Sequence, residues 1–298
     1  MQYVIGRTSR LGNRETNQDR MAILDNNNTV LLVLGDGLGG KAGGEIASET
    51  LVNTVTEAFE SHEFPVEDPQ AYLRSLIDLA HNAIIQAGQQ QEPPIEPGTT
   101  AVLCLLQEGN VCWAHVGDSR LYLYRKGVPL YRTKDHSYVE KLYQSGQISL
   151  DMREEHPMRN VVTRCLGLNK FPPEATTSKT VPLQTGDIIM ICSDGFWDPL
   201  DDVIMATTLQ EGRLEDAINK LAERAEKLSY PNSDNITAAA VQVMSLQLSG
   251  RLRTGERKVP SQPRNEDSIV SAINHIQKTI NEYEGEMKDT DKPSTNKN

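Results

Sequence analysis

The sequence predicts an α+β domain with a layered core, and three observations lead to this prediction. Apolar runs of strand length are separated by short polar turns of the hairpin type. Two long segments carry apolar residues at helical spacing, which is typical of helices that cover one face of a layered core. Beyond residue 245 the composition changes to Arg, Lys, Ser, Pro and Gly, so we expect the folded domain to span residues 1–245 of the 298.

The elements follow from apolar periodicity and turn residues along the chain. Strands are expected at 3–7, 21–24, 30–34, 99–106, 111–117, 121–125, 187–192 and 238–243. Helices are expected at 45–60, 69–90, 137–145, 148–155 and 214–228.

Two regions have no strong pattern. The segment 133–180 is interpreted as an inserted flap, which is either a solvated excursion of the surface or an element that contacts substrate. After a linker that runs to about residue 265, isoleucines at helical spacing over 269–280 predict a short amphipathic helix. That helix either packs back on the domain or binds a partner. Residues 288–298 are expected to be disordered.

The overall charge argues against several classes of partner. The chain has 41 Asp and Glu against 30 Lys and Arg, and its pI is near 5.1, so neither nucleic acid nor an anionic membrane surface is expected to bind it. Residues 1–10 have no signal-peptide core, and no run could cross a bilayer, so a cytoplasmic location is expected. The cysteines form no C-x-x-C pair and are expected to be buried thiols: Cys104, Cys112, Cys165 and Cys192.

Asp36 is the first candidate functional residue. It ends an apolar run and has glycine on both sides, so a ligand can come close to the backbone, and the Gly37 carbonyl is available beside the carboxylate. The segment 35–40 also matches G-x-G-x-x-G, but an Asp in that turn would repel a pyrophosphate, and no acidic residue ends a second strand about twenty residues later. A plain tight turn is the other alternative.

The same pattern of an Asp at a strand end or in a loop recurs, which favours a cation site over a simple turn. If these carboxylates converge, their repulsion requires cations between them, and an all-oxygen site prefers Mg²⁺ or Mn²⁺. Two ions that share Asp36 would lower the pKa of a water between them and provide hydroxide near neutral pH. Arg14 is then a candidate clamp for a phosphoryl group, although in isolation an Arg followed closely by an Asp favours a surface ion pair. The candidate carboxylates are Asp19, Asp36, Asp118, Asp194, Asp198 and Asp234.

Six motifs occur in an order that resembles the metal-dependent type 2C serine/threonine protein phosphatases, and most of all the bacterial branch. The resemblance covers about residues 1–245. It implies a four-layer α-β-β-α sandwich with two central antiparallel sheets and an inserted flap. The motifs are Arg14-x-x-Asn17-Gln18-Asp19, Gly35-Asp36-Gly37-x-Gly39-Gly40, Gly98-Thr99-Thr100-Ala101, Gly117-Asp118-Ser119-Arg120, Ser193-Asp194-Gly195-x-x-Asp198 and Ser233-Asp234-Asn235-Ile236-Thr237.

The resemblance also implies a reaction and a role for each site residue. Phosphoserine and phosphothreonine on proteins would be hydrolysed by attack of a hydroxide that bridges two Mn²⁺ or Mg²⁺ ions, by a monomeric enzyme that opposes a bacterial Ser/Thr kinase. By this resemblance Arg14 binds the phosphate, and Asp36 bridges both metals with the Gly37 carbonyl as a further ligand. Asp194 and Asp234 ligate the first ion, and Asp19 is an outer-shell ligand of the second. Asp118 and Asp198, together with Asp194, ligate a weaker third ion.

Two positions depart from the family pattern. Many eukaryotic members have His where this chain has Leu38, so we expect water in the site to protonate the leaving alkoxide. Gln18 stands where many members have Glu, so the second ion lacks a direct carboxylate ligand at that position.

Two other function classes fit the sequence less well. A cysteine-based phosphatase needs Arg six positions after its Cys, and none of the four cysteines has one. A phosphoprotein-binding module with a degenerate site would usually lack a metal ligand, whereas Asp36, Asp194 and Asp234 are all present.

Overall fold

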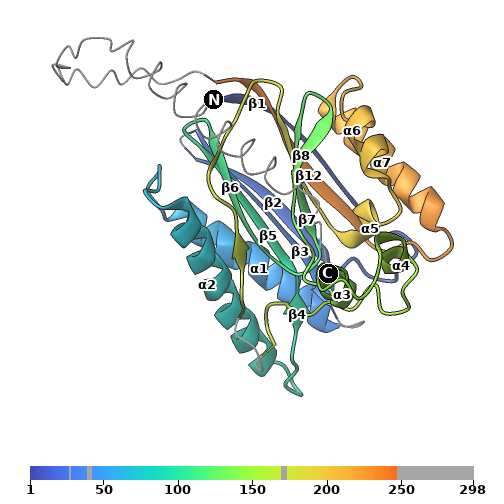
Figure 1. The fold of residues 1–298 in the computed structure, drawn as a ribbon. Coiled ribbons are helices and arrows are strands. Elements are labelled where there is room, and N and C mark those ends of the chain that lie inside the picture. The colour runs from blue at the N-terminus through green and yellow to red at the C-terminus, as the bar shows by residue number, and fades with distance from the viewer. Residues whose placement is uncertain (27, 39–41, 169–172, 247–298) are drawn as a thin grey trace, which may run out of the picture. The chain divides into compact units, whose positions relative to one another are not determined.

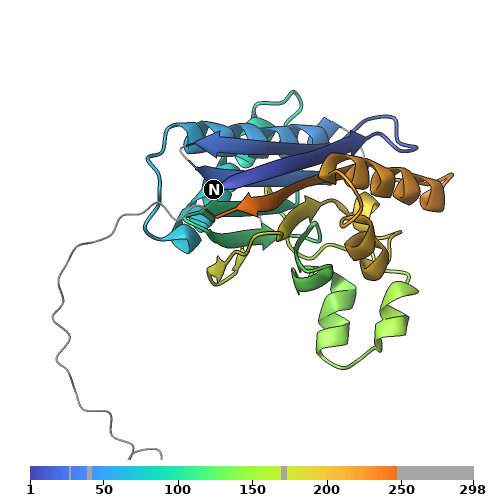
Figure 2. The same cartoon turned by 90° about the horizontal axis from the view of Figure 1, so that it is seen from above.

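Two antiparallel sheets stacked face to face form the centre of the molecule, and helices cover the outer face of each sheet (Figure 1). The computed structural model describes residues 1–26, 28–38, 42–168 and 173–246. The layers follow one another as helix, sheet, sheet and helix (Figure 1), and the view from above shows the flap projecting from one end (Figure 2). The α+β sandwich predicted from the sequence is confirmed.

Each sheet has five strands on its main path. The first has the order β1-β12-β11-β7-β8, with the bounds β1 Gln2–Arg10, β12 Ile236–Ser245, β11 Ile188–Cys192, β7 Arg120–Arg125 and β8 Val128–Arg132. The second has the order β10-β6-β5-β3-β2, with the bounds β10 Val181–Pro182, β6 Asn110–Val116, β5 Ala101–Gln107, β3 Thr29–Leu38 and β2 Asp19–Asn26. Two short strands extend the second sheet, where β4 Gly98–Thr99 pairs with β3 and β9 Thr176–Thr177 pairs with β6.

The helices are divided between the two outer faces and the flap. Two long helices cover the second sheet, two others and the short α5 lie on the first sheet, and two short helices belong to the flap (Figure 1). Their bounds are α1 Ala42–Glu60, α2 Pro69–Gln89, α3 Tyr138–Gln144, α4 Leu150–Glu154, α5 Asp194–Trp197, α6 Asp202–Thr208 and α7 Leu214–Ser229.

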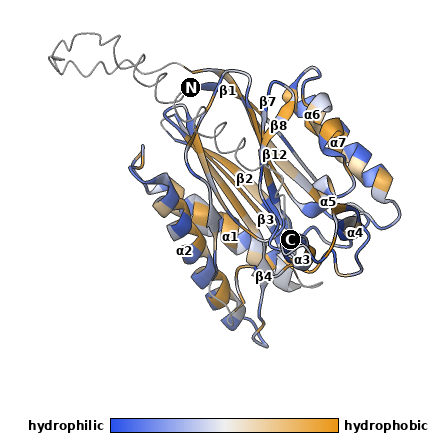
Figure 3. Ribbon diagram, in the orientation of Figure 1, coloured by the Kyte–Doolittle hydropathy of each residue, from blue (hydrophilic) through white to orange (hydrophobic). Residues whose placement is uncertain are grey.

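Alternating side chains of β3 show how one strand serves two cores. Leu31 and Val33 pack against α1 and α2, whereas Leu32 and Leu34 point the other way into the layer between the sheets. The central strands of both sheets are accordingly hydrophobic along most of their length (Figure 3). A strand buried on both faces appears in the sequence as a continuous apolar run, which is the pattern that predicted it.

Most elements lie where the sequence places them, and the differences have physical reasons. β8 was not expected, because it is an edge strand whose five residues are all exposed and which contains Pro129. The seven-residue helix α6 was also missed; it begins after Asp201, whose side chain accepts from Val203 N at 2.7 Å. The predicted tail helix and the segment from 247 onward lie outside the described residues.

No helix within the described ranges has both the length and the apolar character needed to cross a membrane.

Candidate active site

An acidic cavity of about 470 Å³ lies where the loops at one end of the sandwich meet. Its walls come from the β1–β2 loop, the end of β3, the β6–β7 turn, the flap, the start of α5 and the loop before β12. Six of the residues predicted from the sequence line this cavity together: Arg14, Asp36, Gly37, Asp118, Asp194 and Asp234. Residues up to 220 positions apart in the chain therefore share one cavity, as the repeated Asp pattern predicted.

Asp36 and Asp19 are held side by side by strand pairing. They are register partners in the antiparallel pair of β2 and β3, with Asp19 as the first residue of its strand. Asp36 lies two residues before the end of β3 rather than at the end, because β4 continues the pairing through Gly37. A Cβ on Gly37 would lie 2.3 Å from the carbonyl oxygen of Gly44, so α1 can approach the strand this closely only over glycine.

Burial and mutual repulsion raise the pKa values of the carboxyl groups in the cavity. The pKa of Asp19 rises to about 7, mainly through burial and further through Asp194 and Asp234. The pKa of Asp36 is raised well above its usual value by burial and then by Asp19 and Asp194. Burial and Asp194 likewise raise the pKa of Asp118. The pKa of Asp194 rises to about 6, through burial and Asp234, although a side-chain hydrogen bond with Asp36 lowers it.

Asp19 sits behind the cavity wall and leaves one oxygen without a partner. Its side chain is buried, and Oδ2 accepts a hydrogen bond of 2.7 Å from the Ser193 hydroxyl. The other oxygen, Oδ1, has no hydrogen-bond partner among the residues that the structure describes. A buried carboxylate oxygen without a donor is costly, which is a reason to expect a positive group there.

Thr100 and Thr99 fix the backbone of Asp36, and no role was predicted for them. The Thr100 hydroxyl accepts from the amide of Asp36 at 3.0 Å and pairs with the Ser119 hydroxyl at 2.7 Å. The Thr99 hydroxyl donates to the carbonyl of Asp36 at 2.9 Å. Ser119 follows Asp118, so this chain of hydroxyls joins the segments that carry two of the carboxylates. Their motif, Gly98-Thr99-Thr100-Ala101, was the available signal.

Arg14 lies at the edge of the cavity in an ion pair with Asp234. Its Nη2 is 2.6 Å from Oδ2 of Asp234, and the two side chains are 55% and 39% exposed. An ion pair so exposed to solvent contributes little to stability, so the guanidinium can exchange Asp234 for another anion. Asn235, also missed in the sequence, steadies the Arg14 loop because its amide donates to the carbonyls of Leu11 and Thr16 at 2.9 Å and 3.0 Å.

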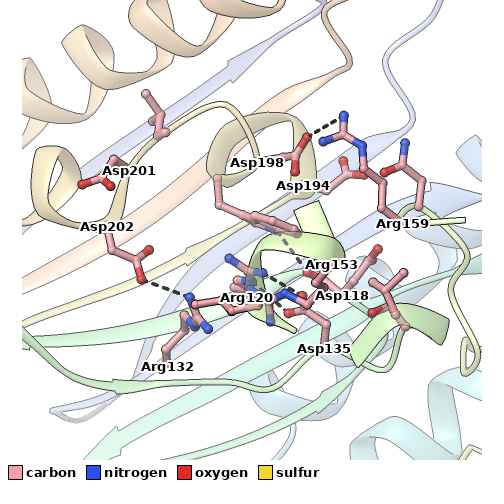
Figure 4. Close-up of a pocket in the computed structure, with 16 residues that line it drawn as sticks. Asp118, Arg120, Arg132, Asp135, Arg153, Arg159, Asp194, Asp198, Asp201 and Asp202 are labelled. Atoms are coloured by element: carbon pink, nitrogen blue, oxygen red, sulfur yellow. Dashed lines mark hydrogen bonds and ion pairs between the residues drawn. The ribbon is translucent and has the colours of Figure 1, made fainter. Parts of the chain in front are cut away.

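Asp198 belongs to an adjoining cavity rather than to the central one. This second cavity, about 370 Å³, also contains Asp118 and Asp194 in its wall and lies between the flap and α5 (Figure 4). Arg159 of the flap approaches Asp198, with an N–O distance of 3.3 Å. The flap therefore contacts the acidic site, which favours the substrate-contacting interpretation of the segment 133–180 over a solvated excursion.

The residues present fit a group of divalent cations. The donors are carboxylate oxygens and the backbone oxygen of Gly37, which suit Mg²⁺ or Mn²⁺, and the partnerless Oδ1 of Asp19 and the raised pKa values show a shortage of positive charge. Within the described ranges, however, no three His, Cys, Asp or Glu side chains form a closed ligand set. Asp234 pairs with Arg14, so ligation by Asp234 requires its side chain to turn away from Arg14.

Comparison with known proteins decides the family. The family described as Protein phosphatase 2C matches residues 7–229, about three quarters of the chain. The chain belongs to the protein phosphatase 2C family. Serine/threonine phosphatase stp of Listeria monocytogenes is 31% identical over 244 residues, which cover 79% of this chain and 94% of that protein. Serine/threonine protein phosphatase PstP of Mycobacterium tuberculosis is 31% identical over 218 residues, 72% of this chain and 40% of its own length.

Solved structures agree with these relatives. Serine/threonine phosphatase Stp1 from Staphylococcus aureus superposes with a TM-score of 0.75 at 28% identity, over 82% of this chain and 96% of that one. The catalytic domain of PstP in complex with two manganese ions superposes with a TM-score of 0.68 at 28% identity, over 82% and 99% of the two chains. This 2C family member is thus a bacterial protein serine/threonine phosphatase, a hydrolase of phosphoproteins with the metal dependence of its family.

Proposed function

We propose that the phosphatase hydrolyses phosphoserine and phosphothreonine with two divalent ions, Mn²⁺ or Mg²⁺, held in the acidic cavity. Asp36 would contact both ions, with Asp194, Asp234 and the Gly37 carbonyl as further ligands and Asp19 in the outer shell. Asp118, Asp194 and Asp198 share the adjoining cavity and would hold a third, weaker ion. The observation that supports this most strongly is the convergence of carboxylates with raised pKa values on one cavity that also contains Arg14.

The ions, when bound, would supply a water of lowered pKa and neutralise the charge of the phosphoryl group. The side chains of the protein orient the phosphoryl group. Arg14 is exposed at the cavity edge, and its guanidinium can bind two phosphate oxygens once it leaves Asp234. Leu38 lines the cavity and has no proton to give, so the proton for the leaving alkoxide does not come from this position.

The substrates proposed are phosphorylated proteins, with a Ser/Thr kinase as the opposing enzyme and a monomer as the active form. The open rim around Arg14, shared with a third cavity of about 380 Å³ beside Pro199 and Ser229, leaves room for a protein segment. A cytoplasmic location is proposed because the four cysteines are all free thiols, three of them buried, as expected in a reducing compartment.

The test is the activity of the purified chain on a phosphothreonine peptide, with Mn²⁺ and then with EDTA. We expect turnover with Mn²⁺, loss in EDTA, recovery when Mn²⁺ is restored, and insensitivity to vanadate. Activity in EDTA, or strong inhibition by vanadate, would contradict the proposed metal site and favour covalent catalysis by a side chain.

A further inference from the structure

The side chain of Trp197 fastens the turn that contains Asp118 to α5. The indole Nε1 donates a hydrogen bond of 3.1 Å to the backbone carbonyl of Asp118. Trp197 is the last residue of α5, and Asp194 is the first. The first residue of α5, Asp194, therefore supplies one carboxylate, and its last residue, Trp197, holds the backbone of Asp118.

This attachment matters because the two carboxylates repel each other. Asp194 is the charged group that acts most strongly on Asp118. Arg120 at the start of β7 is the register partner of Cys192 at the end of β11, so the sheet fixes the distance between the two segments up to this pair. Asp118 and Asp194 each lie two residues beyond this pair, outside the ladder. Coulomb repulsion between the two carboxylates would push Asp118 and the start of α5 apart beyond this last pair of the ladder unless another contact holds them.

Arg120 and Asp135 lock the indole ring in place. The Arg120 guanidinium lies 3.3 Å above the Trp197 ring, and it pairs with both oxygens of Asp135 at 2.8 Å and 2.7 Å (Figure 4). Arg120 and Asp135 are almost fully buried, with 6% and 9% of their side chains exposed. A buried, bidentate pair is rigid, so the ring that it contacts has little freedom to rotate.

The network also reaches the base of the flap. Asp135 precedes His136, whose backbone amide donates to the carbonyl of Gly117 at 2.8 Å. The ring Nδ1 of His136 accepts from the amide of Gly117 at 3.2 Å. The residue just before Asp118 is thus held from the flap side, while Trp197 holds Asp118 from the side of α5.

We propose that Trp197 is a positioning residue that, with Arg120 and Asp135, holds the Asp118 turn at the distance from Asp194 that the weaker divalent ion requires. It touches neither substrate nor the reacting atoms. Its effect is therefore on the affinity of the ion beside Asp118 and Asp194 rather than on the rate at saturating metal. The inference rests on the metal site proposed above.

The decisive variant is Trp197→Phe in the full chain, because Phe keeps an aromatic face for Arg120 and removes the N–H donor, together with part of the ring, a loss of size that the control below shares. A neutral hydrogen bond contributes about 1 kcal/mol, which corresponds to about a five-fold change in an equilibrium constant. We expect the weakest Mn²⁺-binding step, measured by calorimetry, to loosen about five-fold. The Mn²⁺ concentration that gives half-maximal turnover should rise by a similar factor, with kcat at saturating Mn²⁺ within about two-fold of the wild type.

The matched control is Trp113→Phe, the same change at the only other tryptophan, which lies in β6 and contacts Tyr131. It should leave both Mn²⁺ measurements unchanged. A second variant, Arg120→Lys, keeps the positive charge but cannot pair with both oxygens of Asp135 at once, and it should weaken the same Mn²⁺-binding step. Its control is Arg132→Lys, at the exposed ion pair with Asp202.

The outcomes separate this inference from the proposed site. If the wild type binds no Mn²⁺, the proposed metal site fails, and the inference fails with it. If the wild type binds Mn²⁺ and Trp197→Phe binds it equally well, only the positioning role of Trp197 is overturned. A lower kcat that persists at saturating Mn²⁺, with unchanged Mn²⁺ affinity, also overturns it.

Discussion

Replacing the buried carboxylate of Asp19 by its neutral isostere should stabilise the metal-free phosphatase at neutral pH. Folding raises the pKa of Asp19 from 3.8 to about 7, mainly through burial. Because the folded state binds the proton more tightly than the unfolded state, the contribution of Asp19 to stability is fully present below about pH 4 and is lost as the pH rises through about 7. Asp19→Asn cannot lose a proton and keeps an acceptor for Ser193.

The size of the effect follows from the pKa difference. Each pKa unit corresponds to about 1.4 kcal/mol, so a shift of roughly three units gives about 4 kcal/mol between low pH and about pH 8. For a domain of this size, 1 kcal/mol moves the melting temperature by roughly 2–4 °C. In EDTA, the melting temperature of Asp19→Asn should therefore exceed that of the wild type by about 10 °C at about pH 8, and by almost nothing at about pH 4.

The assay is thermal unfolding by circular dichroism, read as the difference between variant and wild type. The difference between the two proteins is needed because buried histidines change the pH dependence of stability in the opposite direction. Burial lowers the pKa of His136 to about 3, so His136 destabilises the fold as the pH falls below about 6.5. That contribution is the same in both proteins and cancels. Glu57→Gln, on the exposed face of α1, is the control for replacing a carboxylate by an amide.

Saturating Mn²⁺ should reverse the order at neutral pH. The ions favour the ionised carboxylates, so the wild type gains more stability from Mn²⁺ than Asp19→Asn does. A variant that is no more stable than the wild type in EDTA at about pH 8, or a difference that does not grow with pH, would refute the reasoning from buried charge.

Three further predictions concern the cavity. Asp194→Asn should reduce turnover of a phosphopeptide to background while the far-UV circular dichroism stays native, and full activity would exclude Asp194 as a ligand. Arg14→Ala should lower kcat/KM about 10- to 100-fold, chiefly by raising KM, since a charged hydrogen bond contributes about 1.5–3 kcal/mol. Arg74→Ala on α2 is the control. An unchanged KM for Arg14→Ala would count against phosphate binding by Arg14. Gly37→Ala should destabilise the domain by about 3 kcal/mol, because its Cβ would lie 2.3 Å from the Gly44 carbonyl oxygen, whereas Gly43→Ala, with a nearest contact of 3.7 Å, should not lower the melting temperature.

The sequence predicted the parts of the site that local patterns determine. Asp36 and Asp194 could be found because each adjoins a strand that is apolar on both faces, and such a strand appears in the sequence as a continuous apolar run. The short edge strand β8 could not, because its exposed residues and Pro129 leave no apolar period. Neither composition nor spacing predicts an edge strand that has so little core contact.

The contacts that orient the carboxylates were beyond prediction for a different reason. The bond from Ser193 to Asp19 joins residues 174 positions apart, and the bond from Trp197 to Asp118 joins residues 79 positions apart. They depend on which distant strands pair and on how the two sheets stack, and the periodicity of a sequence shows neither. The motifs did contain Ser193 and Arg120, but their order in the chain gives membership of a family and not the direction of a side chain.

The measurement that tests the central claim most directly is anomalous diffraction at the manganese edge from crystals grown with Mn²⁺. Two strong peaks should lie in the cavity, with the Asp36 carboxylate touching both and Asp194 and Asp234 touching one. A structure of the active enzyme with no manganese between Asp36 and Asp194 would contradict the account.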